Sequence, residues 1–536
     1  MRELLLGNEA VAMGAIDAGI RGAYSYPGTP ATEIFETIER RADLDRSIVA
    51  RWSVNEKVAY EEAMGMSFVG GRAIVCMKHV GLNVAADPFM SSALTGADAG
   101  FVLVVADDPG MHSSQNEQDT RFYGEFARLP VFEPSNQQEA YDMTREAFEF
   151  SERAGIPVIL RLVTRLAHSR SAVERSRPSP IRNEPTHRGD PNQWTLLPVN
   201  ARRRFRRLIE LQPRLQEHSE KSAFNRLNLR GPTGILATGI AHNYVREVIG
   251  DDPRYSVLKI GVHPVPAALV RRLVDHCNRI LVAEDGFPLV EGKLVGLLGV
   301  PGKTIDGRLN GALPPDGELT ADLIRAGLGL APPPVAESIL DLPARPPMLC
   351  QGCPHCDTFR VILDAVGEGQ SPILFSDIGC YTLGAFPPYN AVHACVDMGA
   401  SISMAYGAAM AGAHPVVCTI GDSTFAHSGM PPLLAAAKDN ANMTVVILDN
   451  AIVAMTGGQR TFVTGDEFIR LLRGLGVDTR HIIPIDPLRQ SQDKNVELMR
   501  REIDYRGLSV VIASRPCIHI KRRSSESEPA ATAALV

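Results

Sequence analysis

Short apolar runs alternate with amphipathic segments along the first part of the chain. Residues 73–77 and 101–106 are continuous apolar runs, whereas residues 9–18 and 56–68 place apolar side chains at helical spacing. Continuous apolar runs indicate strands buried on both faces, and strands that alternate with helices indicate a parallel sheet covered by helices. Residues 1–175 are therefore predicted to form one α/β domain.

The same alternation returns twice further along the chain. An apolar run at 279–284 belongs to a second predicted α/β domain over residues 232–330, and a run at 415–420 belongs to a third over residues 348–520. Each run is bounded by glycine, proline or polar residues, as strands commonly are. The predicted fold class is multi-domain α/β, with parallel sheets covered by helices.

Polar segments separate the predicted domains. Residues 176–231 are rich in Arg, Pro and Asn and predict a linker with one amphipathic helix, residues 331–347 a proline-rich linker, and residues 521–536 a disordered tail. The first linker contains a basic run formed by Arg202, Arg203, Arg204, Arg206 and Arg207. Such a run indicates either a solvated helix face or a contact with an acidic partner subunit.

Composition and charge exclude several classes of protein. The chain has 536 residues, is 45% hydrophobic and 22% charged, and carries a formal net charge of −6. This balance argues against nucleic acid as the main partner, because phosphate-binding surfaces are usually basic. No apolar run approaches the ~18 residues that cross a bilayer, and the first residues do not resemble a secretory signal. We therefore expect a cytoplasmic protein.

Most of the nine cysteines lie between Cys350 and Cys418. In a long chain without an export signal the thiols are expected to be reduced, so a dense group indicates metal or redox chemistry before disulfides. The pair Cys350-x-x-Cys353 alone leaves zinc, a redox pair and two core thiols open. Cys76, Cys277, Cys395 and Cys418 follow no such spacing and are expected to be small core residues.

Two neighbouring apolar runs end in oxygen-bearing side chains. One runs into Gly421 and Asp422, and the next ends at Asn450. Asp and Asn oxygens suit Mg²⁺, glycine lets a backbone approach phosphate closely, and parallel sheets bind ligands at the carboxyl ends of their strands. The pattern predicts a site for magnesium and a diphosphate.

This spacing resembles the thiamine diphosphate motif, and the surrounding sequence resembles the α (large) subunit of indolepyruvate ferredoxin oxidoreductase. Matching stretches follow the family order over nearly the whole chain. They are residues 26–34, 53–58, 78–83, 107–116, 350–355, 377–384, 421–425, 448–450 and 454–457. The resemblance implies a pyrimidine-binding domain over 1–175, a transketolase C-terminal-like domain over 232–330 and a diphosphate-binding domain over 348–520.

The resemblance also implies roles for single residues. Glu56 would hydrogen-bond N1′ of the aminopyrimidine, although a carboxylate at a helix start would have the same position in the sequence. His112 is the first candidate among three motif histidines, with His79 and His355, that guide a carboxylate or shuttle protons; each could also be structural. The remaining cofactor candidates are Gly28 and Thr29, the Mg²⁺ ligands Asp422, Asn450 and the Ile452 carbonyl, and Gly421, Ser423, Thr424, Thr456 and Gly457 along the diphosphate.

Related oxidoreductases hold a proximal 4Fe–4S cluster with four cysteines. The matching positions here are Cys350, Cys353, Cys380 and Cys517, and four thiolates suit such a cluster. Cys356 is a spare thiol or an alternative ligand. The family usually continues into a ferredoxin-like domain with further clusters, which this sequence lacks after Cys517. The acceptor is therefore expected on another subunit or as a docking protein, unless the oxidative reaction is lost.

The resemblance implies oxidative decarboxylation of arylpyruvates such as indolepyruvate to acyl-coenzyme A. Electrons would pass to the 4Fe–4S cluster and then to a ferredoxin-type acceptor, and a dimer of this α subunit would assemble with a smaller β subunit. The alternative is a non-oxidative thiamine diphosphate-dependent decarboxylase or carboligase, which would not need the four cysteines. A third interpretation is a scaffold that binds the cofactor without turnover. The sequence argues against it, because both Glu56 and Asp422 are present.

Overall fold

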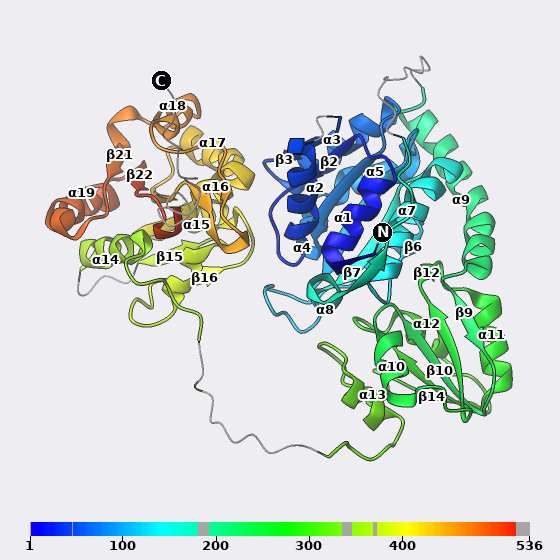
Figure 1. Ribbon diagram of the computed structural model, residues 1–536. Helices are drawn as coiled ribbons and strands as arrows, with labels where there is room; N and C mark the ends of the chain where they lie inside the picture. The colour runs from blue at the N-terminus through cyan, green and yellow to red at the C-terminus, as the bar shows by residue number, and fades with distance from the viewer. Residues whose placement is uncertain are drawn as a thin grey trace, which may run out of the picture. The chain divides into compact units, whose positions relative to one another are not determined.

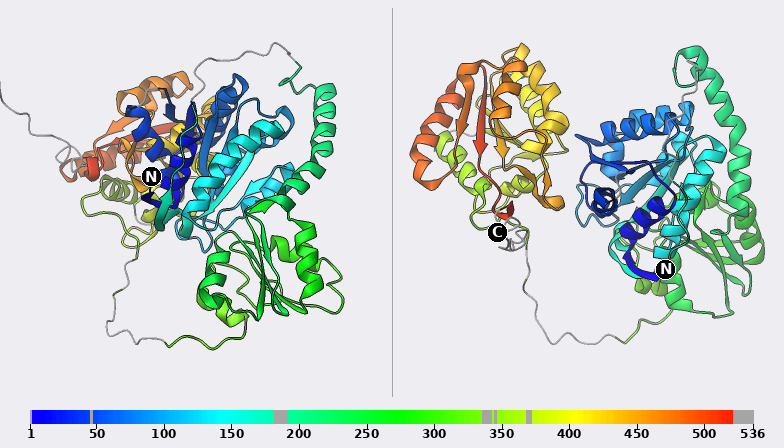
Figure 2. Two further views of the ribbon diagram at one scale, coloured as in Figure 1. Left: turned by 45° about the vertical axis from the view of Figure 1, so that its right-hand side comes forward. Right: turned by 45° about the horizontal axis from the view of Figure 1, so that its top comes forward.

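The computed structural model describes residues 2–44, 47–180, 192–334, 343, 346–367 and 372–520. The chain divides into an N-terminal unit, Met1–Glu337, and a C-terminal unit, Ser338–Val536. Each unit contains mainly parallel sheets flanked by helices (Figures 1 and 2). The predicted α/β class is confirmed, while the domain boundaries inside the N-terminal unit stay a prediction. The predicted tail, 521–536, and most of the predicted linker, 331–347, lie outside the described residues.

A seven-stranded sheet forms the core of the first part of the N-terminal unit. Its strands lie in the order β12-β6-β7-β5-β4-β2-β3. Their bounds are β12 (Val262–His263), β6 (Val131–Phe132), β7 (Val158–Val163), β5 (Phe101–Asp107), β4 (Ala73–Lys78), β2 (Gly22–Ser25) and β3 (Val49–Trp52). The strands are parallel except at β12, which pairs antiparallel with β6. The predicted strands at 73–77 and 101–106 are confirmed as β4 and β5, whose side chains are almost all buried.

Helices surround this sheet, and two strands distant in sequence form a separate two-stranded sheet beside it. The helices are α1 (Gly7–Asp17), α2 (Thr32–Leu44), α3 (Glu56–Phe68), α4 (His79–Val84), α5 (Ala86–Thr95), α6 (Thr120–Ala127), α7 (Gln137–Ala154) and α8 (Thr164–His168). β1 (Arg2–Leu6) pairs antiparallel with β8 (Arg170–Glu174). The predicted amphipathic linker helix is α9 (Pro198–Lys221), which packs against α5 and α11.

A five-stranded sheet completes the N-terminal unit. Its order is β14 (Thr304–Asp306), β13 (Arg279–Ala283), β10 (Thr233–Thr238), β11 (Tyr255–Ile260) and β9 (Arg226–Asn228), with only β9 antiparallel. The accompanying helices are α10 (Ala241–Ile249), α11 (Ala267–His276), α12 (Leu289–Val295) and α13 (Ala321–Gly327). Because β12 comes from this part of the chain yet extends the first sheet, the two sheets share one folded unit.

Buried charges connect the two sheets of the N-terminal unit. Arg161 of β7 donates to Asp107 at 2.6 Å and to Glu133 at 2.5 Å. Arg121 of α6 donates to Glu284, which follows β13, at 2.8 Å. Burial would raise the pKa of Glu133, but Arg121 and Arg161 lower it to about 2. Paired charges of this kind tolerate burial because each finds its counter-ion and hydrogen bonds within the protein.

The C-terminal unit is built on a six-stranded, entirely parallel sheet. The order is β16 (Ala394–Cys395), β15 (Ile373–Ser376), β17 (Val416–Gly421), β18 (Met443–Asp449), β22 (Leu508–Ser514) and β21 (Ile482–Ile485). The main helices are α14 (Pro354–Val366), α15 (Ala400–Met410), α17 (Met430–Lys438), α18 (Asp466–Gly474) and α19 (Gln492–Asp504). Successive side chains of β17 and β18 enter separate cores, which explains their unbroken apolar sequence.

Short elements link these strands. They are η1 (Cys380–Ala385), α16 (Asp422–Thr424), η2 (Phe425–Gly429), β19 (Ile452–Val453), η3 (Ala454–Thr456), β20 (Gln459–Arg460), η4 (Thr479–His481) and η5 (Arg489–Ser491). Among all the helices in the described ranges, none has the length and apolar character to cross a membrane.

Candidate functional site

The carboxyl ends of β17 and β18 place Asp422 beside the segment that begins at Asn450. The two strands are adjacent and parallel, with Gly421 opposite Leu448. Asp422 Oδ1 accepts a hydrogen bond from the Ser423 nitrogen at 2.7 Å, and Oδ2 accepts one from the Ala451 nitrogen at 2.8 Å. The loop after β18 is therefore tied directly to the carboxyl group after β17, as the spacing predicts.

Asp422 has the electrostatic character of a cation ligand. The residue is 3% exposed, and the neighbours that act most strongly on it are Asp449 and backbone N–H groups, with no lysine or arginine among them. Burial raises the pKa of Asp422 to about 8, with Asp449 acting in the same direction and neighbouring backbone N–H groups in the opposite one. A bound cation would favour the charged carboxylate, so the site fits a hard divalent ion such as Mg²⁺.

Asn450 is held in one orientation by three neighbours. Its Oδ1 accepts a hydrogen bond from the Ile452 nitrogen at 3.1 Å, and its Nδ2 donates to His355 Nε2 at 3.2 Å. Its backbone carbonyl accepts from the Cys517 nitrogen at 3.1 Å. Ala451 between the two predicted ligands has φ +63°, a left-handed turn that reverses the chain after β18. The carbonyl of Ile452 as a ligand stays a prediction.

The glycine before Asp422 has a packing role that sequence reasoning missed. A Cβ on Gly421 would lie 2.7 Å from Tyr381 Cε1, so the Tyr381 ring occupies the space that any side chain would need. Tyr381 is buried, and its hydroxyl donates to the Ile378 carbonyl at 3.2 Å. Thr424 donates to the same carbonyl at 3.2 Å. Packing against the Tyr381 ring therefore requires glycine at this position, whether or not a phosphate also approaches the backbone here.

The other predicted diphosphate residues lie in two loops of the C-terminal unit. Ser423 and Thr424 form the first turn after β17 and are buried. Thr456 ends η3, where its hydroxyl donates to Gln459 Oε1 at 2.7 Å, and Gly457 follows with φ +124°. Their contact with a diphosphate stays a prediction.

The predicted cluster cysteines approach one another in the C-terminal unit. Burial, with nearby thiols acting in the same direction, raises the pKa of Cys353 to about 12 and that of Cys380 to about 11. For Cys353 these neighbours are Cys356, Cys380 and Cys350; for Cys380 they are Cys517 and Cys350. Mutual repulsion of thiolates is what a cationic metal centre would relieve.

The cysteine region also contains an open cavity. Cys350, Cys353 and Cys356 line a cavity of about 750 Å³, together with Arg360 and Arg515. Within the described ranges no three His, Cys, Asp or Glu side chains stand at the spacing of a closed metal site. The cysteines have the chemistry and the common location that a cluster needs, but not the spacing of a closed site, and ligation by the four cysteines stays a prediction. Cys356 lies in the same turn, and its nitrogen donates to the Cys353 carbonyl.

In the N-terminal unit, Glu56 begins α3 and is buried. It is 5% exposed, and a Cβ on Gly81 would lie 2.6 Å from its Oε1. Gly81 belongs to α4, which follows β4, so the second and third matching stretches meet at this point. A solvated carboxylate at a helix start would not need such burial. The contact with an aminopyrimidine stays a prediction.

Lys78 at the end of β4 is a site residue that sequence reasoning did not single out. Its aliphatic chain lies against Gly28, whose Cβ would be 3.3 Å from Lys78 Cδ, and its Nζ donates to the Ser113 carbonyl at 3.1 Å. Burial lowers the pKa of Lys78, whereas Asp108 and Glu56 act in the opposite direction. The available signal was a lysine that ends a buried strand inside a matching stretch.

Thr29 and the motif after β5 meet next to this lysine. The Ser113 hydroxyl donates to the Thr29 carbonyl at 3.5 Å, and the Gly28 nitrogen donates to Thr32 Oγ1 at 3.1 Å. The four matching stretches of the N-terminal unit therefore lie at the carboxyl ends of β2, β3, β4 and β5, the edge at which parallel sheets bind ligands.

The three motif histidines have different surroundings. His79 is buried, and its Nε2 lies 3.1 Å from the Asn116 carbonyl. The side chain of His112 is 53% exposed and lies 3.6 Å from Glu318 Oε2. His355 is buried beside Asn450, and burial lowers its pKa to about 4, so its ring is neutral at pH 7. Their chemical roles stay predictions.

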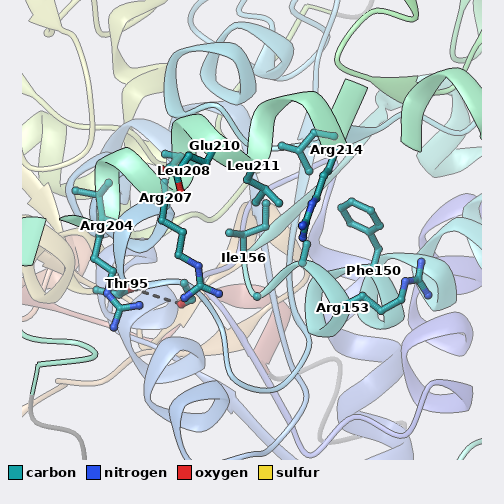
Figure 3. A pocket seen from close by; sticks show the side chains of 16 residues that line it. Thr95, Phe150, Arg153, Ile156, Arg204, Arg207, Leu208, Glu210, Leu211 and Arg214 are labelled. Carbon is teal, nitrogen blue, oxygen red and sulfur yellow. Dashed lines mark hydrogen bonds between the residues drawn. The ribbon is translucent and has the colours of Figure 1, made fainter. Parts of the chain in front are cut away.

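The basic run on α9 is divided between two faces. Arg202, Arg203, Arg206 and Arg207 are exposed, and Arg204 is half-buried. Arg204 and Arg207 line a cavity of about 460 Å³ with Arg153 and Arg214 (Figure 3). Contact of this helix with an acidic partner stays a prediction.

Comparisons with known proteins found matches in both the N-terminal and the C-terminal unit. A family model for "Pyruvate flavodoxin/ferredoxin oxidoreductase, thiamine diP-bdg" matches residues 13–207, and one for "Thiamine pyrophosphate enzyme, C-terminal TPP binding domain" matches residues 377–480. The indolepyruvate oxidoreductase subunit IorA of Archaeoglobus fulgidus is 39% identical over 98% of this chain and 88% of its own. The IorA subunit of Pyrococcus abyssi is 37% identical over 96% of this chain and 86% of its own.

A solved structure shares the fold at low sequence identity. The 2-oxoglutarate:ferredoxin oxidoreductase of Magnetococcus marinus, described with 2-oxoglutarate, coenzyme A and succinyl-CoA bound, has a TM-score of 0.51 and 16% identity. The match covers 61% of this chain and 65% of that one.

Proposed function

Because the chain belongs to the family of indolepyruvate oxidoreductase IorA subunits, a family of thiamine diphosphate-dependent 2-oxoacid:ferredoxin oxidoreductases, we propose that it oxidatively decarboxylates arylpyruvates such as indolepyruvate. The acyl group would pass to coenzyme A, and the electrons would pass through a 4Fe–4S cluster to a ferredoxin-type acceptor. The observation that carries the proposal is the buried Asp422, which accepts a hydrogen bond from the loop after β18. The Asn450 carbonyl of the same loop accepts a hydrogen bond from the Cys517 nitrogen.

Each candidate residue has a specific task in this proposal. Asp422, Asn450 and the Ile452 carbonyl hold Mg²⁺, and Gly421, Ser423, Thr424, Thr456 and Gly457 bind the diphosphate. When bound, thiamine diphosphate supplies the carbon nucleophile that adds to the 2-oxoacid and an acceptor for the electrons left by carbon dioxide. Glu56 holds a proton at N1′ of the aminopyrimidine, near Gly28 and Thr29, and His112 orients the substrate carboxylate.

The four predicted cluster cysteines serve electron transfer. Cys350, Cys353, Cys380 and Cys517 would bind the cluster as thiolates, and a 4Fe–4S cluster accepts electrons one at a time. The Cys517 N–H donates to the Asn450 carbonyl, so one of the four cysteines is joined to the predicted magnesium loop by a backbone hydrogen bond. The subunit belongs to a multi-subunit enzyme, and we propose a smaller β subunit, a dimer of this chain and a ferredoxin as its partners.

Reconstitution tests the proposal. The chain is purified anaerobically with its smaller subunit, and arylpyruvate-dependent reduction of a viologen dye or ferredoxin is followed with and without coenzyme A. We expect reduction that requires both coenzyme A and arylpyruvate and is lost in D422N, together with stoichiometric iron and sulfide. Release of carbon dioxide without acceptor or coenzyme A would instead favour the non-oxidative decarboxylase.

A further inference from the structure

His355 lies where the cysteine-bearing turn meets the candidate magnesium loop. It is the second residue of α14, two positions after Cys353, and it is 3% exposed. Its Nε2 accepts a hydrogen bond from Asn450 Nδ2 at 3.2 Å. Its ring also meets the Tyr381 ring edge-on, with centroids 5.9 Å apart. Tyr381 in turn fills the space over Gly421, so His355 contacts Asn450 directly and the Gly421 turn only through Tyr381.

The amide of Asn450 could face the site in either of two orientations. The Ile452 N–H can only donate, so the atom that it binds at 3.1 Å must be the amide oxygen. The amide nitrogen then faces His355, whose Nε2 must act as an acceptor. If the amide flipped, its nitrogen would turn towards the cation, which binds oxygen and not an N–H group.

We propose that His355 is a positioning residue that fixes the Asn450 amide with its oxygen towards the divalent cation. The inference rests on the proposed function, because it takes the Asn450 oxygen as a magnesium ligand. His355 does not touch the cation in this proposal. Its contribution is the acceptor that the amide nitrogen needs in a buried place, since an unpaired buried N–H group is costly.

Two substitutions separate the acceptor from the volume of the ring. H355Q retains an acceptor oxygen near the position of Nε2, whereas H355L fills a similar volume without one. We expect H355L to raise the Mg²⁺ concentration for half-saturated thiamine diphosphate binding by about tenfold, as losing about 1.4 kcal/mol would. H355Q should stay within about threefold of the unchanged protein, because the side-chain oxygen of the introduced glutamine can still accept the hydrogen bond from the Asn450 amide. The measurement is calorimetric titration of the full chain across a Mg²⁺ series.

His393 provides a matched control in the same unit. Its Nδ1 accepts a hydrogen bond from the Leu374 nitrogen at 3.1 Å, outside the candidate site. H393L should lose thermal stability but keep the Mg²⁺ requirement of the unchanged protein, as monitored by melting and by the same titration. An equal rise in the Mg²⁺ requirement in H355L, H355Q and H393L would overturn the proposal, as would no rise in H355L. If the unchanged protein binds no thiamine diphosphate with Mg²⁺, the proposed function itself fails.

Discussion

At the scale of single residues, Gly81 shows how a missing side chain supports a functional one. A Cβ at this position would lie 2.6 Å from Glu56 Oε1, well inside contact distance. G81A should therefore displace the Glu56 carboxyl and weaken thiamine diphosphate binding by about tenfold, or about 1.4 kcal/mol. Calorimetric titration in saturating Mg²⁺ measures the change.

Gly65 on α3 is the control for this substitution, because a Cβ there would meet nothing within 4 Å. G65A should leave binding unchanged and stabilise the helix by about 0.5–1 kcal/mol. Unchanged binding in G81A would contradict the role given to Glu56.

A second prediction at this scale concerns Asp285, which is buried and follows β13. Its Oδ1 accepts a hydrogen bond from the Leu319 nitrogen at 3.0 Å, and its Oδ2 has no partner among the described residues. Burial raises the pKa of Asp285 to about 6, although the Leu319 N–H and Arg161 act in the opposite direction. The unfolded chain releases this proton near pH ~3.9, so the folded protein binds more protons between these values.

Stability should consequently fall as the pH rises through this window. D285N removes the titration, so the melting temperature of the unchanged protein relative to D285N should decrease from about pH 4 to about pH 7. The change corresponds to about 1–3 kcal/mol, since one pKa unit is worth about 1.4 kcal/mol. If the difference in melting temperature between the two proteins did not change with pH across this range, Asp285 would not titrate as described.

At the scale of elements, the most consequential charge is Arg161 in the middle of β7. It is fully buried and binds Asp107, Glu133 and the Asp285 carbonyl. R161M would leave Asp107 without its ion-pair partner and Glu133 with only the more distant Arg121 and His263, and breaking a buried pair in this way costs about 3–5 kcal/mol. Urea unfolding of the N-terminal unit should show a loss of this size.

Arg165, a few residues further along, offers a contrast. Its side chain is 47% exposed and pairs with Glu318. R165M should cost no more than about 1 kcal/mol, as exposed ion pairs usually do. Similar losses in R161M and R165M would contradict the view that burial decides the energetics of the Arg161 pair.

The elements also show what could be predicted from the sequence. β4, β5, β17 and β18 are buried on both faces, so their unbroken apolar runs identify them. β12 has two residues and joins the first sheet only by long-range pairing with β6, which no local pattern reports. Arg161 stands out as a charge inside an apolar run, but its partners come from β5, from the segment after β6 and from the loop after β13, far away in the sequence.

The residues of the candidate site also fall into those that could be predicted from the sequence and those that could not. Asp422 and Asn450 could be predicted because adjacent parallel strands bring their ends together. Glu56 and the four cysteines could be proposed only through family resemblance, because their neighbours are distant in sequence. Lys78, Tyr381 and the contact between His355 and Asn450 were missed, because each depends on a tertiary contact between separate segments.

At the scale of the whole molecule, our proposal assigns two residues to one coenzyme, Glu56 of the N-terminal unit and Asp422 of the C-terminal unit. In the proposed dimer these two residues can come from different copies of the chain. Co-purified mixed dimers of E56Q and D422N chains, carrying different tags, test this. If each site uses both copies, one site of the mixed dimer combines the two substitutions and the other combines the unchanged Glu56 with the unchanged Asp422.

The mixed dimer should therefore recover arylpyruvate-dependent dye reduction, although each parent dimer is inactive. Recovery arises because a symmetric dimer has two equivalent sites, and the two defects can fall together in one of them. If both residues of a site came from one copy, each site of the mixed dimer would keep one defect, and activity would stay at the level of the parents. Dye reduction per mixed dimer, compared with the unchanged dimer purified by the same two tags, decides between these arrangements.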